Sequence, residues 1–312
     1  MSVQENQPTR VLLIVGMGRS GSTMIERALA GVPGVVGLGE VVHLWERGVR
    51  DNELCACGAP FHDCDFWSQV GRRAFGGWAA LDVDRVIAQR AEVIRTRYVS
   101  RLLAGRGSPS WHTTLQELTD THLKVLGAAK DVAGARLVVD SSKLPAYAAM
   151  LATGKVDLRM VEVVRDPRGV AYSLRKTVRR PEASDDADVM HRTGLVASSA
   201  WWSAFELLGR MLNRSGQDLM TTIRYEDFVS DPAETLAQIC QFVQMSGADL
   251  SHLEGDRLLL QPNHQIAGNP VRFDSGVATI RADEEWRAGL STREQRTVKV
   301  LTTGLRRRHG YR

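Results

Sequence analysis

Residues 10–29, RVLLIVGMGRSGSTMIERAL, decide the fold. The apolar run from Val11 to Val15 predicts a strand buried on both faces, as strands of parallel sheets are. A glycine-rich turn ends this run, and the residues from Ser22 to Ala30 predict a helix that begins directly after the turn. A strand that leads through a glycine turn into a helix is typical of the start of an α/β fold.

The turn itself carries the groups of an anion-binding site. Backbone N–H groups at a helix N-terminus hold phosphate oxygens, and hydroxyls and a guanidinium add further donors. Gly16, Gly21 and Thr23 match the phosphate-binding pattern G-x-x-x-x-G-K-[ST], but Ser22 replaces its lysine and Arg19 stands inside the turn. A plain tight turn with an exposed arginine is less favoured, because glycines, hydroxyls and the cation all fall within eight residues.

The rest of the chain repeats the strand-then-helix order. Apolar runs at Arg136–Val139, Leu158–Val164 and Leu219–Ile223 each precede a helix signal. Asp231 followed by Pro232 predicts the start of the helix after the last of these runs. We therefore expect one α/β domain over residues 1–312, with a P-loop-type parallel sheet flanked by helices.

A long helical segment interrupts this order. About 100 mostly helical residues, 40–133, follow the first strand–helix unit, which is too many for a simple crossover. We expect this segment to be an insertion over the carboxyl ends of the strands, where ligands bind in such sheets, and to act as a lid.

Composition and charge limit the classes of partner that we expect for this protein. The 312 residues are 43% hydrophobic with a net charge of +4, which fits a globular protein and allows an anionic substrate. Aromatic and basic residues do not interleave into an RNA-binding motif, so we expect no nucleic-acid partner. No apolar run approaches the roughly 20 residues of a membrane span, and the first residues lack a signal-peptide pattern. We expect a cytoplasmic protein with no membrane span; nothing in the sequence indicates an oligomeric state.

The turn also carries a family resemblance. GRSGSTM resembles the 5′-phosphosulfate loop of sulfotransferases that use 3′-phosphoadenosine 5′-phosphosulfate (PAPS), in which Lys or Arg precedes Ser-Gly-Thr/Ser-Thr/Ser. The resemblance implies PAPS as the sulfuryl donor, no required metal, and a role for one arginine in stabilising the leaving phosphate. The matching positions are Arg19, Ser20, Gly21, Ser22 and Thr23.

Three later segments resemble other parts of the same family. VVRDPRGVAYSLRK resembles its 3′-phosphate motif, which implies Arg165 and, eight residues on, Ser173. TIRYEDFVSDP resembles the segment whose tyrosine lies near the adenine, which implies Tyr225, although a core aromatic fits this residue type equally well. HQIAGNPVRF resembles the loop that closes over the 3′-phosphate, which implies Gly268, Asn269 and Arg272.

Transfer to a hydroxyl needs a base near the attacking oxygen. Where cytosolic members of the family have a histidine in Lys-Thr-His-Leu-Pro, this sequence has SSKLP, so Lys143 stands there as a poor base but a fair electrostatic partner. Glu40 resembles the Gly-Glu position that supplies the base in other branches, and His43 would share its face of a helix. The structural alternative for Glu40 is a carboxylate that favours a helix N-terminus.

A cysteine-rich stretch, CACGAPFHDCDFW, leaves its role open. Three thiolates and an imidazole suffice for a tetrahedral zinc site, but Cys-x-Cys is tighter than the usual spacing. A buried apolar cluster with the neighbouring aromatic residues is favoured over zinc, a redox disulfide comes next, and we expect no metal. The residues concerned are Cys55, Cys57, Cys64 and His62, with Phe61, Phe66 and Trp67.

The favoured function is therefore PAPS-dependent sulfuryl transfer to a hydroxyl of a small-molecule, carbohydrate or lipid acceptor, with an amine less favoured. A P-loop kinase is one alternative, with Asp140 as its metal-holding aspartate, although the loop lacks the kinase lysine. A catalytically silent nucleotide-binding protein is the other alternative.

Overall fold

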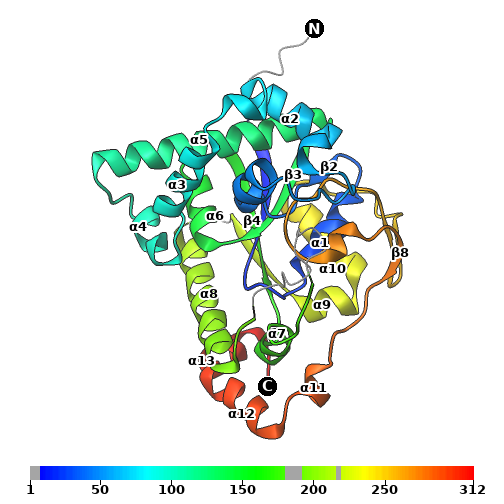
Figure 1. Ribbon diagram of the computed structural model, residues 1–312. Coiled ribbons are helices and arrows are strands. Elements are labelled where there is room, and N and C mark those ends of the chain that lie inside the picture. The colour runs from blue at the N-terminus through cyan, green and yellow to red at the C-terminus, as the bar shows by residue number, and fades with distance from the viewer. Residues whose placement is uncertain (1–7, 180–191, 216–218) are drawn as a thin grey trace.

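A parallel sheet of five strands forms the centre of the molecule, in the order β2-β3-β1-β4-β5 (Figure 1). The computed structural model describes residues 8–179, 192–215 and 219–312. The strands are β1 (Thr9–Val15), β2 (Val35–Gly37), β3 (Leu137–Lys143), β4 (Val156–Val164) and β5 (Met220–Arg224).

Helices cover both faces of this sheet. They are α1 (Ser22–Ala30), α2 (Asp65–Phe75), α3 (Val83–Val93), α4 (Val99–Leu103), α5 (Pro109–Val132), α6 (Pro145–Leu151), α7 (Pro167–Ser173), α8 (Leu195–Ser215), α9 (Tyr225–Ser230), α10 (Pro232–Phe242), α11 (Trp286–Gly289), α12 (Thr292–Leu301) and α13 (Thr303–Arg306). A small antiparallel sheet of β6 (Leu253–Glu254), β7 (Arg257–Leu260) and β8 (Gly276–Thr279) lies beside α1.

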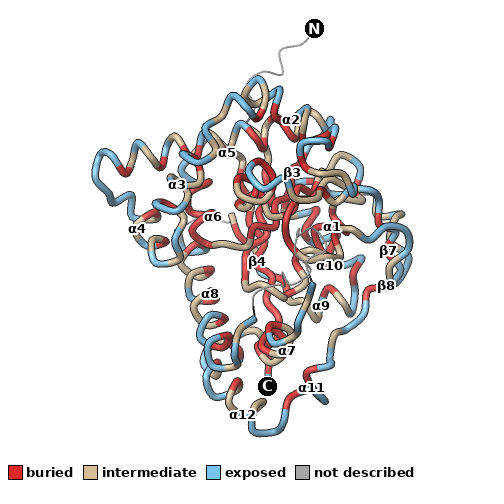
Figure 2. The backbone as a smooth tube through the Cα atoms, in the orientation of Figure 1, coloured by how far each residue is buried: buried red, intermediate tan, exposed pale blue. Residues whose placement is uncertain are grey.

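The central strand β1 shows why this sequence forms a two-sided core. Val11, Leu13 and Val15 belong to the apolar cluster that α5 and α6 cover, whereas Leu12 and Ile14 belong to the cluster that α1 and α10 cover. Because successive side chains of a strand point to opposite faces, an unbroken apolar run is what this position needs. Figure 2 shows the buried residues concentrated in these strands and the exposed ones on the outer helices.

The α/β fold predicted from the sequence is confirmed, with differences at the element ends. The first strand and the helix Ser22–Ala30 lie where the pattern places them. The strand predicted at Arg136–Val139 continues to Lys143. The helix that follows the Leu158–Val164 run begins at Pro167, and the Asp166 side chain caps it by accepting a hydrogen bond from Arg168 N (2.9 Å).

The helical segment 40–133 does two things. Its longest helix, α5, packs on one face of the sheet against β1, β3 and α6, with α2 and α3 outside it. Its first residue, Glu40, reaches the carboxyl ends of the strands. The action of this segment as a lid stays a prediction. Among the described helices, none combines the length and the apolar character that crossing a bilayer requires.

Candidate active site

The loop between β1 and α1 has a backbone that depends on two glycines. Gly16 has φ 126°, and a Cβ there would lie 2.5 Å from the Val163 carbonyl oxygen of the neighbouring strand. Gly21, the N-cap of α1, has φ 88°, and a Cβ there would lie 2.6 Å from the Tyr225 ring. Side chains at either position would therefore push the loop off the strand end or off the tyrosine.

Within this loop, Arg19 and Ser20 offer buried donors that are not satisfied. Arg19 takes φ 71°, a left-handed conformation that costs a non-glycine residue energy and is found at binding sites. Among the described residues, neither its Nη2 nor the buried Ser20 hydroxyl has a hydrogen-bond partner. Buried polar groups are normally paired, so these donors fit an anionic ligand at the N-terminus of α1.

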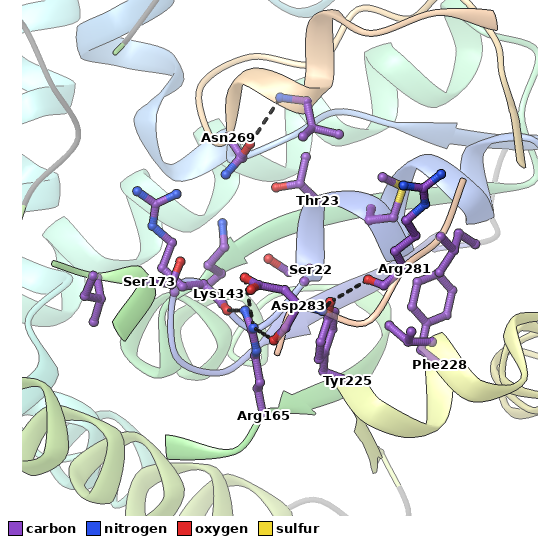
Figure 3. A pocket seen from close by; sticks show the side chains of 18 of the residues that line it. Ser22, Thr23, Lys143, Arg165, Ser173, Tyr225, Phe228, Asn269, Arg281 and Asp283 are labelled. Carbon is purple, nitrogen blue, oxygen red and sulfur yellow. Dashed lines mark hydrogen bonds and ion pairs between the residues drawn. The ribbon is translucent and has the colours of Figure 1, made fainter. Parts of the chain in front are cut away.

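A cavity of about 490 Å³ opens beside the loop, a volume usual for small-ligand sites (Figure 3). It brings together ten of the residues predicted from the sequence: Arg19, Gly21, Ser22, Thr23, Glu40, Lys143, Arg165, Ser173, Tyr225 and Asn269. These come from the segments at the carboxyl ends of all five strands, from the end of α7 and from the loop that contains Asn269. Phe228, Val229, Val271 and Ile280 add an apolar part to its wall.

Arg165, at the end of β4, is the second cation of the cavity. Its Nη1 donates to the Arg19 carbonyl oxygen (3.0 Å), and its Nη2 donates to the Asp283 carbonyl oxygen (2.7 Å) and lies 3.0 Å from the Asp283 carboxylate. The guanidinium also stacks on the Tyr225 ring, 4.5 Å from its centre. The arginine is thus fixed between the anion loop and the 281–285 segment, as Figure 3 shows.

Glu40 and Lys143 form a partly buried ion pair in the cavity wall. Lys143 Nζ also donates to the Ser141 carbonyl oxygen (3.1 Å). Burial raises the pKa of Glu40, but the attraction of Lys143 outweighs it, so the pKa lies below its ordinary value and the side chain is a carboxylate at neutral pH. Gly268 packs against this carboxylate, and a Cβ there would lie 2.9 Å from Glu40 Oε1.

His43 lies behind Glu40 rather than in the cavity lining. Its Nε2 is 3.6 Å from Glu40 Oε2, and its Nδ1 accepts from Arg90 Nη2 at 3.4 Å. Burial lowers the pKa of His43 to about 4 despite the attraction of Glu40, so the ring is neutral at neutral pH. Because Arg90 must donate to Nδ1, the ring proton lies on Nε2 and no nitrogen lone pair faces the cavity.

Glu26, a residue that the sequence pattern did not single out, holds the peptide before Glu40. Its carboxyl group accepts from Gly39 N (2.7 Å) and from the Ser141 hydroxyl (2.5 Å), and it is fully buried. Burial raises its pKa to about 7. Glu26 belongs to α1, so the helix that carries the anion loop also positions Glu40.

The predicted closing-loop arginine lies elsewhere. Arg272 is fully buried outside the cavity lining, where its Nη2 donates to the Leu54 carbonyl oxygen (3.1 Å). Arg281 and Asp283, which sequence reasoning missed, line the cavity instead. Tyr225 holds their segment, since its hydroxyl donates to the Arg281 carbonyl oxygen (3.1 Å) and accepts from Asp283 N (3.1 Å).

Comparison with known protein families identifies the family of this chain. A family model described as the sulfotransferase family matches residues 12–249. The chain belongs to the sulfotransferase family. Family membership supports sulfuryl transfer as the general activity of this sulfotransferase.

Solved structures of similar fold are distant in sequence. A sulfotransferase domain from the curacin biosynthetic pathway is 15% identical with a TM-score of 0.51, over 96% of this chain and 99% of that one. A sulfotransferase domain of the Synechococcus PCC 7002 olefin synthase is 19% identical with a TM-score of 0.48, over 97% and 98%. Sulfotransferase STF1 of Mycobacterium tuberculosis is 17% identical with a TM-score of 0.44, over 96% and 77%. These likenesses concern the fold alone, and no curated protein sequence matches this chain closely enough to be a relative.

Proposed function

We propose that this sulfotransferase moves the sulfuryl group of PAPS to a hydroxyl group of a small-molecule, carbohydrate or lipid acceptor. The observation that carries the proposal is that one cavity contains two separate cationic side chains, Arg19 in the anion loop and Arg165 at the end of the neighbouring strand. A nucleotide with phosphates at both its 5′ and 3′ positions needs two such binding positions. Family membership favours the same donor.

The loop residues would hold the 5′-phosphosulfate. Arg19 and Ser20 supply the unsatisfied buried donors, and the N-terminus of α1 supplies backbone N–H groups. In the transfer, negative charge grows on the leaving phosphate, and donors already aimed at that charge lower the barrier without reorganising. Arg165 and Ser173 would hold the 3′-phosphate, with Arg281 in the role that the sequence suggested for Arg272.

Glu40 is the proposed base. It lines the cavity as a carboxylate and can accept the proton of an acceptor hydroxyl, whereas His43 turns its protonated nitrogen toward Glu40. Lys143, paired with Glu40, would stabilise the charge of the sulfuryl oxygens. A neutral hydroxyl needs such a base at the moment of attack, so a hydroxyl acceptor suits this pair.

The position of Asp140 argues against the kinase alternative. In a P-loop kinase this aspartate would face the nucleotide through a magnesium ion. Here its carboxylate is fully buried, accepts from Ser142 N (2.8 Å) and Ser142 Oγ (2.5 Å), and does not belong to the cavity lining of the described chain. The silent-binding alternative is left to the experiment.

The test is a transfer assay with sulfur-labelled PAPS and matched alcohol and amine acceptors from the small-molecule, carbohydrate and lipid classes, without added divalent metal. We expect label on an alcohol, and tighter binding of 3′-phosphoadenosine 5′-phosphate than of ATP with Mg²⁺. Tight binding without turnover of any acceptor would favour the silent protein. Phosphoryl transfer from ATP with Mg²⁺ would favour the kinase.

A further inference from the structure

Three cysteine sulfurs and one histidine nitrogen converge at the edge of the helical segment. Cys55, Cys57 and Cys64 lie close in sequence, whereas His264 comes from a loop 200 residues further on. The four ligand atoms all lie within 4.8 Å of one another. The described cysteines carry free thiols.

Four of the six separations between these atoms are close to the edges of a metal-centred tetrahedron. The sulfur of Cys64 is 3.6 Å from that of Cys55 and 3.7 Å from that of Cys57, and His264 Nδ1 is 3.3 Å from Cys64 Sγ and 3.8 Å from Cys55 Sγ. With Zn–S of about 2.3 Å and Zn–N of about 2.0 Å, a regular tetrahedron has S···S edges of about 3.8 Å and S···N edges of about 3.5 Å.

The backbone builds the site as a tight turn and a helix start. Gly58 takes φ 90°, its N–H bonds the Cys55 carbonyl oxygen (2.8 Å), and the resulting turn brings Cys57 back toward Cys55. Cys64 is the residue directly before α2.

His264 is held in place from three sides. The Trp67 indole donates to its carbonyl oxygen (2.7 Å), the Phe66 ring stacks on its imidazole at 4.9 Å, and Ala56 N bonds the next carbonyl oxygen, that of Gln265 (3.0 Å). His62, the histidine that the sequence placed in this cluster, instead makes a 2.9 Å hydrogen bond with the Val49 carbonyl oxygen. The fourth ligand position therefore belongs to His264.

The two alternatives that the sequence favoured explain these contacts less well. An apolar cluster needs buried thiols, but Cys57 is exposed while its sulfur still points at Cys64. A disulfide would use two sulfurs and leave the third, together with the imidazole nitrogen that faces two of them, without a purpose. Three thiolates and one imidazole in a tetrahedron are the donor set that zinc prefers.

We propose that Cys55, Cys57, Cys64 and His264 bind one structural Zn²⁺. Four protein ligands close the coordination shell, so the metal serves structure rather than chemistry. The metal would link the loop of His264 to the helical segment 40–133. In the same loop the Ile266 carbonyl oxygen accepts from Glu40 N (2.9 Å), and Gly268 packs on the Glu40 carboxylate. The metal link therefore supports the wall of the cavity.

The first measurement is the zinc content of the untagged full chain, produced with zinc in the medium and freed of loose metal. We expect about one zinc per chain in the wild type, and less than about a fifth of that in Cys57→Ser and in His264→Ala. His62→Ala and Cys240→Ala are the matched controls, since His62 is the rejected ligand and Cys240 lies in the core cluster on the other side of the sheet. Both controls should keep the metal.

The second measurement keeps the test valid where a variant folds poorly. Wild-type protein stripped of metal and titrated with Co²⁺ should develop thiolate-to-cobalt absorption and the visible bands of tetrahedral cobalt, saturating at one ion per chain. Chelator should lower the melting temperature of the wild type but not of Cys57→Ser, whose exposed position limits other effects of the change.

Three outcomes would overturn the proposal: wild-type protein without zinc or a cobalt spectrum, stoichiometric zinc in Cys57→Ser and His264→Ala, or a disulfide found by thiol titration of the denatured wild type. Each measurement is made without nucleotide or acceptor. A failure here therefore leaves the proposed sulfuryl transfer standing, and a failure of that function leaves the zinc site standing.

Discussion

Replacing Arg165 by alanine should remove the preference for a 3′-phosphate and leave binding of 5′-AMP nearly unchanged. A guanidinium has five N–H donors. In the described chain three of them are used, one by the Arg19 carbonyl oxygen and two by Asp283. Two donors remain for a phosphate. At about 1.5 kcal/mol for each charge-assisted hydrogen bond they contribute about 3 kcal/mol, which is roughly a hundredfold in affinity.

The assay is calorimetric titration of wild type and variant with 3′-phosphoadenosine 5′-phosphate and with 5′-AMP, in buffer without added divalent metal. We expect a wild-type affinity ratio of at least about one hundred and a ratio near one in Arg165→Ala. Arg168→Ala is the matched control, because it removes a guanidinium only three residues away, in α7. The Arg168 side chain pairs with Asp166, stacks on Trp286 and does not line the cavity. Its ratio should stay close to that of the wild type.

Equal affinity of the wild type for the two nucleotides would refute this reasoning. So would a ratio that falls equally in both variants, since the loss would then reflect general damage to α7. A preference retained in Arg165→Ala but lost in Arg281→Ala would place the 3′-phosphate on the 281–285 segment alone.

Three further changes test other parts of the site. Arg19→Ala should lower kcat by the equivalent of about 2.7–4 kcal/mol, as loss of an oxyanion donor does, and a rate near that of the wild type would refute the role of this arginine. Glu40→Gln should keep nucleotide affinity and lower kcat by about 10²–10⁴, whereas an active Glu40→Gln beside an inactive His43→Ala would move the base to His43. Glu26 has its pKa raised to about 7 by burial, so the folded state holds a proton that the unfolded state loses above about 4.5. The free energy of unfolding should therefore fall by about 3 kcal/mol as pH rises from about 4.5 to 7. Urea unfolding at several pH values should show that Glu26→Gln removes this part of the pH dependence, whereas the part due to Glu162, whose pKa is also raised to about 7, remains. An unchanged pH dependence in Glu26→Gln would contradict the assignment.

The sequence predicted most reliably those features that depend on neighbours along the chain. Arg165 and Ser173, which the family resemblance implied, both line the cavity. The first strand, the glycine turn and α1 follow from apolar runs and a helix start within 20 residues. Such features need no knowledge of the distant chain, because local sterics and periodicity determine them.

The errors concern side chains whose direction is set by distant contacts. Arg272 lies in the segment that the motif indicated, but the Leu54 carbonyl oxygen draws its guanidinium out of the cavity. Arg281 stands after a short edge strand with no motif to mark it, and the distant Tyr225 hydroxyl holds its backbone at the cavity. His264 could not be paired with the cysteines, since a separation of 200 residues leaves no spacing to recognise.

The same helix controls both halves of the proposed chemistry. The N-terminus of α1 presents the anion loop, and Glu26, in the second turn of that helix, bonds Gly39 N, so the peptide that leads into Glu40 is tied to the helix that would hold the leaving phosphate. A buried carboxyl group with a pKa near 7 is costly, and a neutral side chain would fill the space more cheaply. A fixed distance between the base and the leaving group would explain why this costly residue is present, because misplacement by about 1 Å can lower the rate a hundredfold. Lys143 then pairs with the Glu40 carboxylate, and the Ile266 carbonyl oxygen accepts from the Glu40 N–H, so three different segments restrain this residue before any substrate enters.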